Sequence, residues 1–204
     1  MLSVVKTFVV QSYQLHPQAV NSMTGMLAFT CGDIMSQQIA TNESNKKVDY
    51  GKAIKTGFLG VLMNGLFLHH WYRGLDKAFG SSMKKNTRGI IFKMVADQII
   101  YSPIAIAIFF GWVSSYSIEN EGTDLVPITN KFNVENINRV VVKFKEKMNN
   151  FFLSTWATDC CFWPLINLVN FRYVPLNYRP TYVGIAQIAW QTFMSYISNQ
   201  PKQT

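Results

Sequence analysis

Three aspartates lie within or at the edge of long apolar stretches, and they are the residues best placed to do chemistry. They are Asp33, Asp97 and Asp159. A single ionised carboxylate in hydrocarbon costs about 2.5–3.5 kcal/mol on insertion scales, so such a residue faces a bundle interior, pairs with a base or contacts water. These aspartates could line a polar path or hold a counter-ion. They could equally fix helix register through buried pairs, and the candidate basic partners are Arg73, Arg179, His69 and Lys93.

Uncharged polar side chains accompany these acids at helical spacing. An amphipathic helix of a soluble protein usually carries charges on its wet face, whereas the last apolar stretch carries amides there instead. A polar stripe without charge would face a partner or an aqueous path. The residues that we predict to line a pore or form a buried polar interior are Asp33, Gln37, Asp97, Gln98, Asp159, Gln187 and Gln191.

The sequence contains no motif typical of an enzyme. Neither GxSxG, a Walker loop, HExxH nor GxGxxG before a helix is present. The three cysteines, Cys31, Cys160 and Cys161, lack the CxxC or Cys/His spacing of a zinc site. We expect them to be small buried hydrophobic residues. The sequence therefore predicts no catalytic site, no bound metal and no cofactor.

The distribution of charge argues against nucleic-acid binding. Charged residues make up 15% of the 204 residues, whereas soluble domains average about 25%. The net charge is +8, but the 19 lysines and arginines lie in connectors between apolar stretches. A nucleic-acid site needs them clustered on one element. Basic connectors are typical of solvated loops and of contact with phospholipid head groups, so we expect a lipid bilayer and not a nucleic acid as partner.

Five uncharged stretches are the elements that must position these residues. A membrane helix needs about 20 mostly apolar residues. The third of the five stretches, Gln98–Ile118, meets this requirement by itself. The stretches are too long for strands, and none alternates with a period of two. Small residues recur every four positions in the first and third, as in membrane helices that pack closely. The stretches are Thr7–Gly32, Thr56–Tyr72, Gln98–Ile118, Cys160–Phe171 and Pro180–Pro201.

These stretches predict an all-α fold, an integral membrane bundle of four to five helices in a single domain over residues 1–204. Residues 1–16 form an N-terminal segment. Residues 131–148 are apolar at intervals of three and four and charged elsewhere, which predicts one amphipathic helix that lies on the membrane surface or caps the bundle. Pro103 and Pro164 predict bends. A soluble helical bundle with close glycine contacts is the alternative.

The C-terminal third carries a specific string of residues, Trp-Pro, Asn-Phe, Val-Pro and Arg in that order. With it, the chain resembles the Mpv-seventeen family of small mitochondrial inner-membrane and peroxisomal membrane proteins, from about Tyr13 to Tyr196. One departure is Asn64-Gly65, which stands where the family usually has Gly-Pro. The residues that carry the family motif or pack helices are Gly32, Trp156, Trp163, Pro164, Asn167, Asn170, Phe171, Pro175, Arg179 and Trp190.

The resemblance implies a small bundle of membrane helices that acts as a pore for small solutes. It also implies support of mitochondrial homeostasis and mitochondrial DNA maintenance. We therefore predict a weakly selective channel in the mitochondrial inner membrane, with small solutes and a possible second copy of the chain as partners. A non-conducting membrane scaffold and a peroxisomal membrane pore are the alternatives. The N-terminus, which carries Lys6 and no acid before Asp33, favours the mitochondrion.

Overall fold

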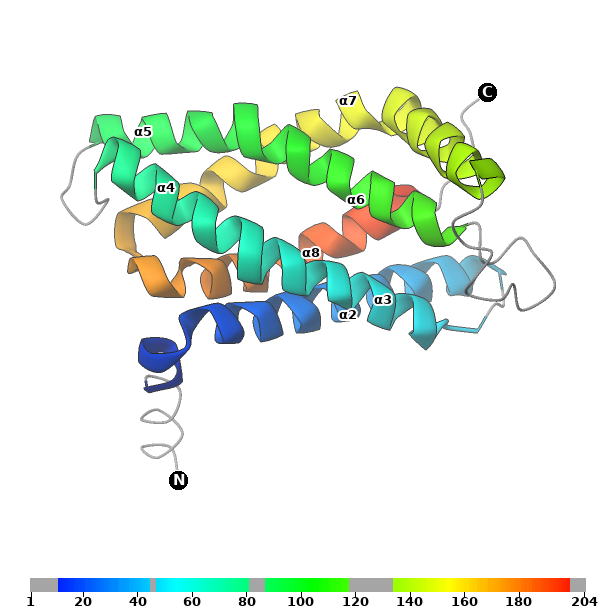
Figure 1. Cartoon of the computed structure of the whole chain (residues 1–204), viewed down its shortest axis with the longest axis horizontal. Coiled ribbons are helices and arrows are strands. Elements are labelled where there is room, and N and C mark those ends of the chain that lie inside the picture. Colours follow the sequence, from blue (N-terminus) through cyan, green and yellow to red (C-terminus); the bar gives the residue numbers. More distant parts are fainter. Residues whose placement is uncertain (1–10, 45–46, 81–86, 118–133, 199–204) are drawn as a thin grey trace.

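Long helices lie side by side in the protein (Figure 1). The computed structural model describes residues 11–44, 47–80, 87–117 and 134–198, and every regular element in these ranges is a helix. The all-α prediction is confirmed for them. In chain order the elements are α2 (Pro17–Ser44), α3 (Tyr50–Gly60), η1 (Val61–Leu68), α4 (His69–Phe79), α5 (Thr87–Ala96), η2 (Asp97–Tyr101), α6 (Ser102–Ser117), α7 (Val134–Tyr173), η4 (Leu176–Tyr178) and α8 (Arg179–Ser198).

Five long rods result from this order in the described part of the chain. The elements α3, η1 and α4 follow one another without a gap, and so do α5, η2 and α6. The helix α2 packs against α8 and against the rod that contains α3, while α6 packs against α7. A core of aromatic and aliphatic side chains, including Phe110, Phe171 and Met194, fills the space between them.

Small residues allow α2 to approach its neighbours closely. The backbones of Gly25 and Gly60 touch where α2 crosses α3, so a Cβ atom on either would collide with the carbonyl oxygen of the other. Gly32 lies in the same way against Gln191 of α8. Helices that cannot use hydrophobicity to associate in a membrane pack through such contacts. The small residues of the third stretch do not make such a close contact at Gly111. A Cβ atom there would have a ring carbon of Phe144 as its nearest neighbour, at 3.9 Å.

Two of the rods contain wide π-helical turns, η1 and η2. Pro103 is the second residue of α6, and proline removes a backbone donor and clashes with the carbonyl four residues before it. The turn before it is widened, and the amide of Ser102 donates to the carbonyl of Asp97. Turns of this kind occur often at functional sites. The bend predicted at Pro103 therefore takes the form of a π-helical turn.

Residues 134–148 are helical as predicted, but they form the first part of a longer helix. The helix α7 runs without a break for 40 residues and continues through Pro164, while residues 131–133 lie outside the described part. Charge marks where an apolar stretch ends, but a charged residue does not by itself end a helix. The first part of α7 lies across one end of the bundle (Figure 1). The side chains of Ile137 and Val142 in this part are exposed.

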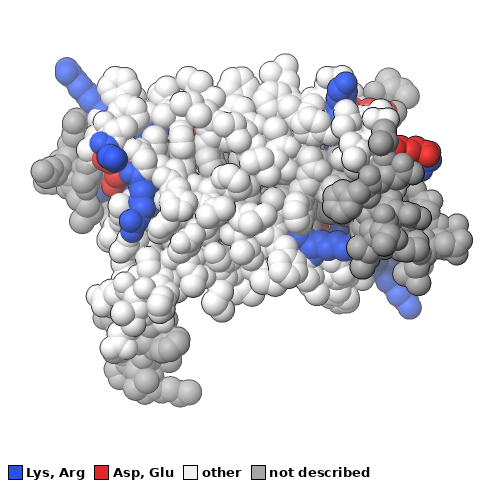
Figure 2. Space-filling model, in the orientation of Figure 1, with Lys and Arg blue, Asp and Glu red and all other residues white. Residues whose placement is uncertain are grey.

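The lateral surface of the protein is apolar. Leu153, Leu165 and Ile185 are each at least 70% exposed. In the face shown in Figure 2, the charged side chains lie toward the two ends, with an uncharged band between them. By length and mean hydropathy, one helix of the described part, Thr87–Ser115, is apolar enough to cross a membrane.

The cysteines also lie on the surface, so the prediction that they are buried is wrong. All three are exposed. Cys31 precedes Gly32, and Cys160 follows Asp159, and both of these neighbours are buried. Successive residues of a helix point about 100° apart. A cysteine next to an inward-facing position therefore faces outward.

Candidate functional site

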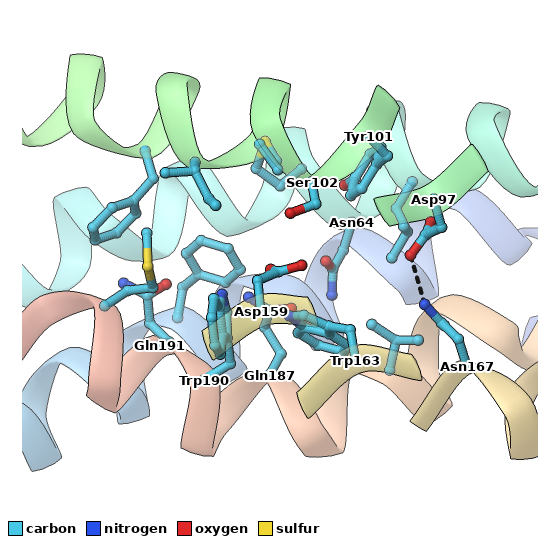
Figure 3. A pocket seen from close by; sticks show the side chains of 18 of the residues that line it. Asn64, Asp97, Tyr101, Ser102, Asp159, Trp163, Asn167, Gln187, Trp190 and Gln191 are labelled. Carbon is cyan, nitrogen blue, oxygen red and sulfur yellow. Dashed lines mark hydrogen bonds between the residues drawn. The ribbon is translucent and has the colours of Figure 1, made fainter. Parts of the chain in front are cut away.

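A polar cavity lies inside the bundle, where η1, η2, α6, α7 and α8 meet (Figure 3). Its volume is about 60 Å³, which is room for a few water molecules. Both π-helical turns contribute to its wall. The polar residues that line it are Asn64, Tyr72, Asp97, Tyr101, Ser102, Asp159, Asn167, Gln187 and Gln191, and apolar side chains fill the rest of the wall.

Asp97 is held by neutral hydrogen-bond donors from two other rods. Its side chain is buried, with 5% of its surface exposed. One carboxylate oxygen accepts a hydrogen bond of 2.8 Å from Trp71 Nε1 in α4, and the other accepts one of 2.5 Å from Asn167 Nδ2 in α7. Tyr72 in turn donates to Asn167 Oδ1 at 3.3 Å. The carboxylate of Asp97 is therefore fixed in the cavity wall.

Asp159 carries an unpaired carboxylate oxygen into the same cavity. Its Oδ2 is buried without a hydrogen-bond partner, and so are Ser102 Oγ and Asn64 Nδ2. Figure 3 shows the side chains of Asp159 and Ser102 directed into one space. An unpaired buried polar group costs about 1–3 kcal/mol, and polar cavities of sufficient size hold water that satisfies such groups. The arrangement can therefore bind water or a small polar solute.

Asp33 forms a separate hydrogen-bond network in the C-terminal half of α2. Its carboxylate accepts hydrogen bonds from Ser195 Oγ at 2.9 Å and from Gln37 Nε2 at 2.8 Å. Gln191 donates to Ser195 at 3.1 Å, and Gln37 accepts from the backbone amide of Asp49, just before α3, at 2.6 Å. These contacts tie α2 to α8 and to the start of α3.

The structure thus divides the residues predicted to line a pore into two groups. Those in the cavity wall are Asp97, Asp159, Gln187 and Gln191. Those outside it are Asp33, Gln37 and Gln98, and the buried side-chain amide of Gln98 has no hydrogen-bond partner. Sequence reasoning missed Ser102 and Asn64 as cavity residues. The only signal for Asn64 was that it replaces a residue usual in the family, and Ser102 gave none.

The predicted basic partners of the three aspartates belong elsewhere. Lys93 Nζ lies 2.5 Å and Arg179 Nη1 lies 2.8 Å from the same oxygen of Asp76, and both cations are fully buried. His69 Nδ1 lies 3.4 Å from the side-chain amide of Asn21, and Arg73 is exposed. Of the four candidate partners, Lys93 and Arg179 pair with Asp76 and not with one of the three aspartates. A sequence shows which acids and bases are present, but only the packing of the helices shows which of them contact each other.

Asp76 is therefore a largely buried carboxylate whose ion pairs sequence reasoning did not predict. It follows the apolar stretch that ends in Tyr72, where a charged residue resembles an ordinary loop residue. A signal existed, since Lys93 lies close to the third apolar stretch and Arg179 directly before the fifth. Buried cations need a paired anion.

The motif residues form one wall of the cavity and the turn beside it. The rings of Trp163 and Trp190 line the cavity and meet edge to face at 5.9 Å. Trp156 Nε1 donates to the backbone carbonyl of Gln98 at 3.0 Å. Pro175 begins the turn into α8 and accepts a hydrogen bond from the amide of Tyr178. The others are Pro164, partly buried in α7, buried Asn170, and Phe171, whose ring lies 5.4 Å from the guanidinium of Arg179.

Comparison with known proteins identifies the family to which this chain belongs. A family model described as the Mpv17 / PMP22 family matches residues 138–195, which lie in α7, η4 and α8. PXMP2/4 family protein 2 of Dictyostelium discoideum is 33% identical over 191 residues, which cover 90% of this chain and 85% of that protein. The chain belongs to the Mpv17/PMP22 family. The predicted resemblance is confirmed.

Other relatives of the Mpv17/PMP22 family match over similar lengths. PXMP2/4 family protein 4 of Dictyostelium discoideum is 27% identical over 189 residues, 91% of this chain and 90% of that protein. The mitochondrial inner membrane protein Mpv17 of Drosophila melanogaster is 27% identical over 168 residues, 82% of this chain and 88% of that protein. No solved structure matches the chain. Within the described residues, no group of three or more His, Cys, Asp or Glu could hold a metal ion.

Proposed function

We propose that this chain is an integral membrane protein of the mitochondrial inner membrane whose cavity is a narrow, mostly closed path for small solutes. The observation that carries the proposal is a buried polar cavity with two carboxylates in its wall, Asp97 and Asp159. Placing two acids inside a bundle is costly, and intramembrane ionisable residues commonly mark a substrate or ion pathway. The role is transport and not catalysis.

The apolar lateral surface supports the membrane location. Exposed leucines and isoleucines cover the outside of the rods, and the uncharged band in Figure 2 separates the charged ends. The shortest rod, α8, has 20 residues, which at about 1.5 Å per residue matches a hydrocarbon core of about 30 Å. By length alone, all five rods are long enough to span the bilayer. The first part of α7 would lie on its surface.

The proposed location follows from a relative. The similar protein of Drosophila melanogaster is named a mitochondrial inner membrane protein, and the acid-poor N-terminus of this chain agrees with it. A fluorescent protein fused to the C-terminus of the full chain should co-localise with an inner-membrane marker. Co-localisation with a peroxisomal marker would contradict the proposal.

Supply of metabolites through such a path would support mitochondrial homeostasis and mitochondrial DNA maintenance.

The size of the cavity accounts for a path that is mostly closed. A volume of about 60 Å³ holds a few waters and not a hydrated metabolite. A wide opening in the inner membrane would dissipate the proton gradient. Conduction therefore requires the helices to separate. The turns η1 and η2, which both contribute to the wall, are sites where the helical hydrogen bonds are already irregular.

Conductance measurements test the proposal. Purified full-length protein in planar bilayers should show discrete current steps. Asp97→Asn and Asp159→Asn should each change the step size, because each removes a carboxylate from the wall. Glu135→Gln is the matched control, since Glu135 is exposed in the first part of α7. Silence at all voltages and with all solutes would contradict the path and favour a non-conducting scaffold.

A further inference from the structure

A second groove lies where the start of α2 meets the start of α4, apart from the polar cavity. Nine residues line it, among them the cation Arg73 and three imidazoles, those of His16, His69 and His70. No carboxylate is among the described residues that line it. It shares no lining residue with the cavity described above. A concave surface with this composition is complementary to an anion.

The positive charge of Arg73 is not neutralised by the acid nearest to it on its own helix. Asp76 lies three residues further along α4, at a distance where side chains on a helix can pair. Its carboxylate is held by Lys93 at 2.5 Å and by Arg179 at 2.8 Å. The guanidinium of Arg73 is thus available to the groove, and the ring of His70 lies 5.4 Å from that of His69.

The backbone at the start of α2 adds donors to the same groove. The helical turn over residues 11–15 is interrupted at His16, and Pro17 has no backbone N–H. The hydrogen bond that closes the first turn of α2 runs from the amide of Val20 to the carbonyl of His16, at 3.2 Å. The residues between them, Gln18 and Ala19, line the groove. The first turn of a helix carries partial positive charge and open amides.

We propose that this groove binds a phosphate group. A tetrahedral dianion accepts two parallel hydrogen bonds from a guanidinium, as Arg73 can supply, and further ones from imidazole and amide donors. His70 and Arg73 are exposed on α4, whereas Trp71 and Tyr72 of the same helix turn inward, toward Asp97 and Asn167. The phosphate belongs either to the head group of an anionic phospholipid or to a soluble phosphate ester.

Two binding measurements on the full-length protein test the site and distinguish the sources. The lipid probe is fluorescent phosphatidic acid in phosphatidylcholine nanodiscs, with energy transfer from the protein tryptophans as the readout. The soluble probe is radiolabelled inorganic phosphate, in equilibrium dialysis against the protein in nanodiscs of phosphatidylcholine alone. Saturable binding of either probe supports the site and names the source. Failure of both to bind overturns the proposal.

Variants on one helix separate a built site from general attraction. Arg73→Gln should weaken binding roughly tenfold, the effect of losing one charge-assisted contact. His70→Gln, at a second exposed position, should weaken it in the same direction. Lys77→Gln is the control, because Lys77 is exposed on α4 and does not line the groove. An equal loss with Lys77→Gln would show nonspecific electrostatic attraction and overturn the proposal. Neither result depends on whether the protein conducts.

Discussion

At the scale of single residues, one carboxylate pairs with two fully buried cations. Asp76 joins α4 to Lys93 of α5 and to Arg179, the first residue of α8. Lys93 also donates to the carbonyl of Gly80, and Arg179 donates to the carbonyl of Val174 at 3.2 Å. Three rods thus converge on one acid. Removing it would take away the carboxylate that both buried cations contact.

We expect Asp76→Asn to be strongly destabilising. Breaking a buried ion pair by removing one partner costs about 3–5 kcal/mol, and here the lost partner serves two cations. Chemical unfolding of the protein in detergent micelles, followed by tryptophan fluorescence, measures the change. Glu135→Gln is the control, because the side chains of Glu135 and Arg139 are 68% and 60% exposed, and such surface pairs contribute about 0.5 kcal/mol or less. Equal effects of the two substitutions would contradict the role assigned to Asp76.

The sequence predicts which acids are buried better than it predicts their hydrogen-bond partners. That Asp33, Asp97 and Asp159 face the interior follows from the cost of exposing an acid to hydrocarbon, and the structure buries all three. Which donor meets each acid depends on residues far along the chain. Asp97 meets Asn167, which is 70 positions away. The family motif singles out Asn167 but does not indicate which acid its amide meets.

At the scale of elements, a contact between two glycine backbones sets how closely α2 and α3 pack. Gly60→Ala should destabilise the bundle by about 1–3 kcal/mol, since the added methyl meets the backbone of Gly25 and has no flexible neighbour to displace. At Gly111 in α6 an added methyl meets only a ring carbon of Phe144, at an ordinary contact distance of 3.9 Å, so Gly111→Ala should be neutral or slightly stabilising, because alanine favours helix. Unfolding curves of both variants decide this. Comparable losses would show that small residues do not act through close packing.

Apolar stretches indicate where helices are but not where they end. The second stretch, Thr56–Tyr72, lies within a rod that runs from Tyr50 to Phe79. Asp49 starts this rod by accepting a hydrogen bond from the amide of Lys52 at 2.9 Å. Capping by an aspartate is readable from sequence. The π-helical turns are not, because they arise where packing and proline constraints compete with regular helix.

At the scale of the whole molecule, many polar side chains lie inside the bundle beside an apolar core, and many apolar side chains lie on the outside. Buried polar residues such as Asp33, Asn64 and Arg179 lower the hydropathy of each helix. The chain therefore has a mean hydropathy of only +0.07, and one helix of the described part is apolar enough to cross a membrane by composition. Average hydropathy underestimates membrane insertion when the interior of a bundle is polar.

The native cysteines test this arrangement directly. Cys31, Cys160 and Cys161 are exposed on the outer faces of α2 and α7. If that surface faces lipid, the thiols are shielded from ions, and thiolate formation in hydrocarbon is strongly disfavoured. A charged, membrane-impermeant maleimide should leave all three unmodified in intact membranes. Solubilisation and unfolding should then allow all three to react.

A positive control is Glu135→Cys in a background with the three native cysteines changed to serine. Glu135 lies in the charged first part of α7, which we place on the membrane surface. Its thiol should react quickly in membranes that have been opened to expose both faces. Rapid reaction of the native cysteines under the same conditions would mean that water reaches the apolar band. The protein would then be a soluble bundle, and both the membrane location and the solute path would be contradicted.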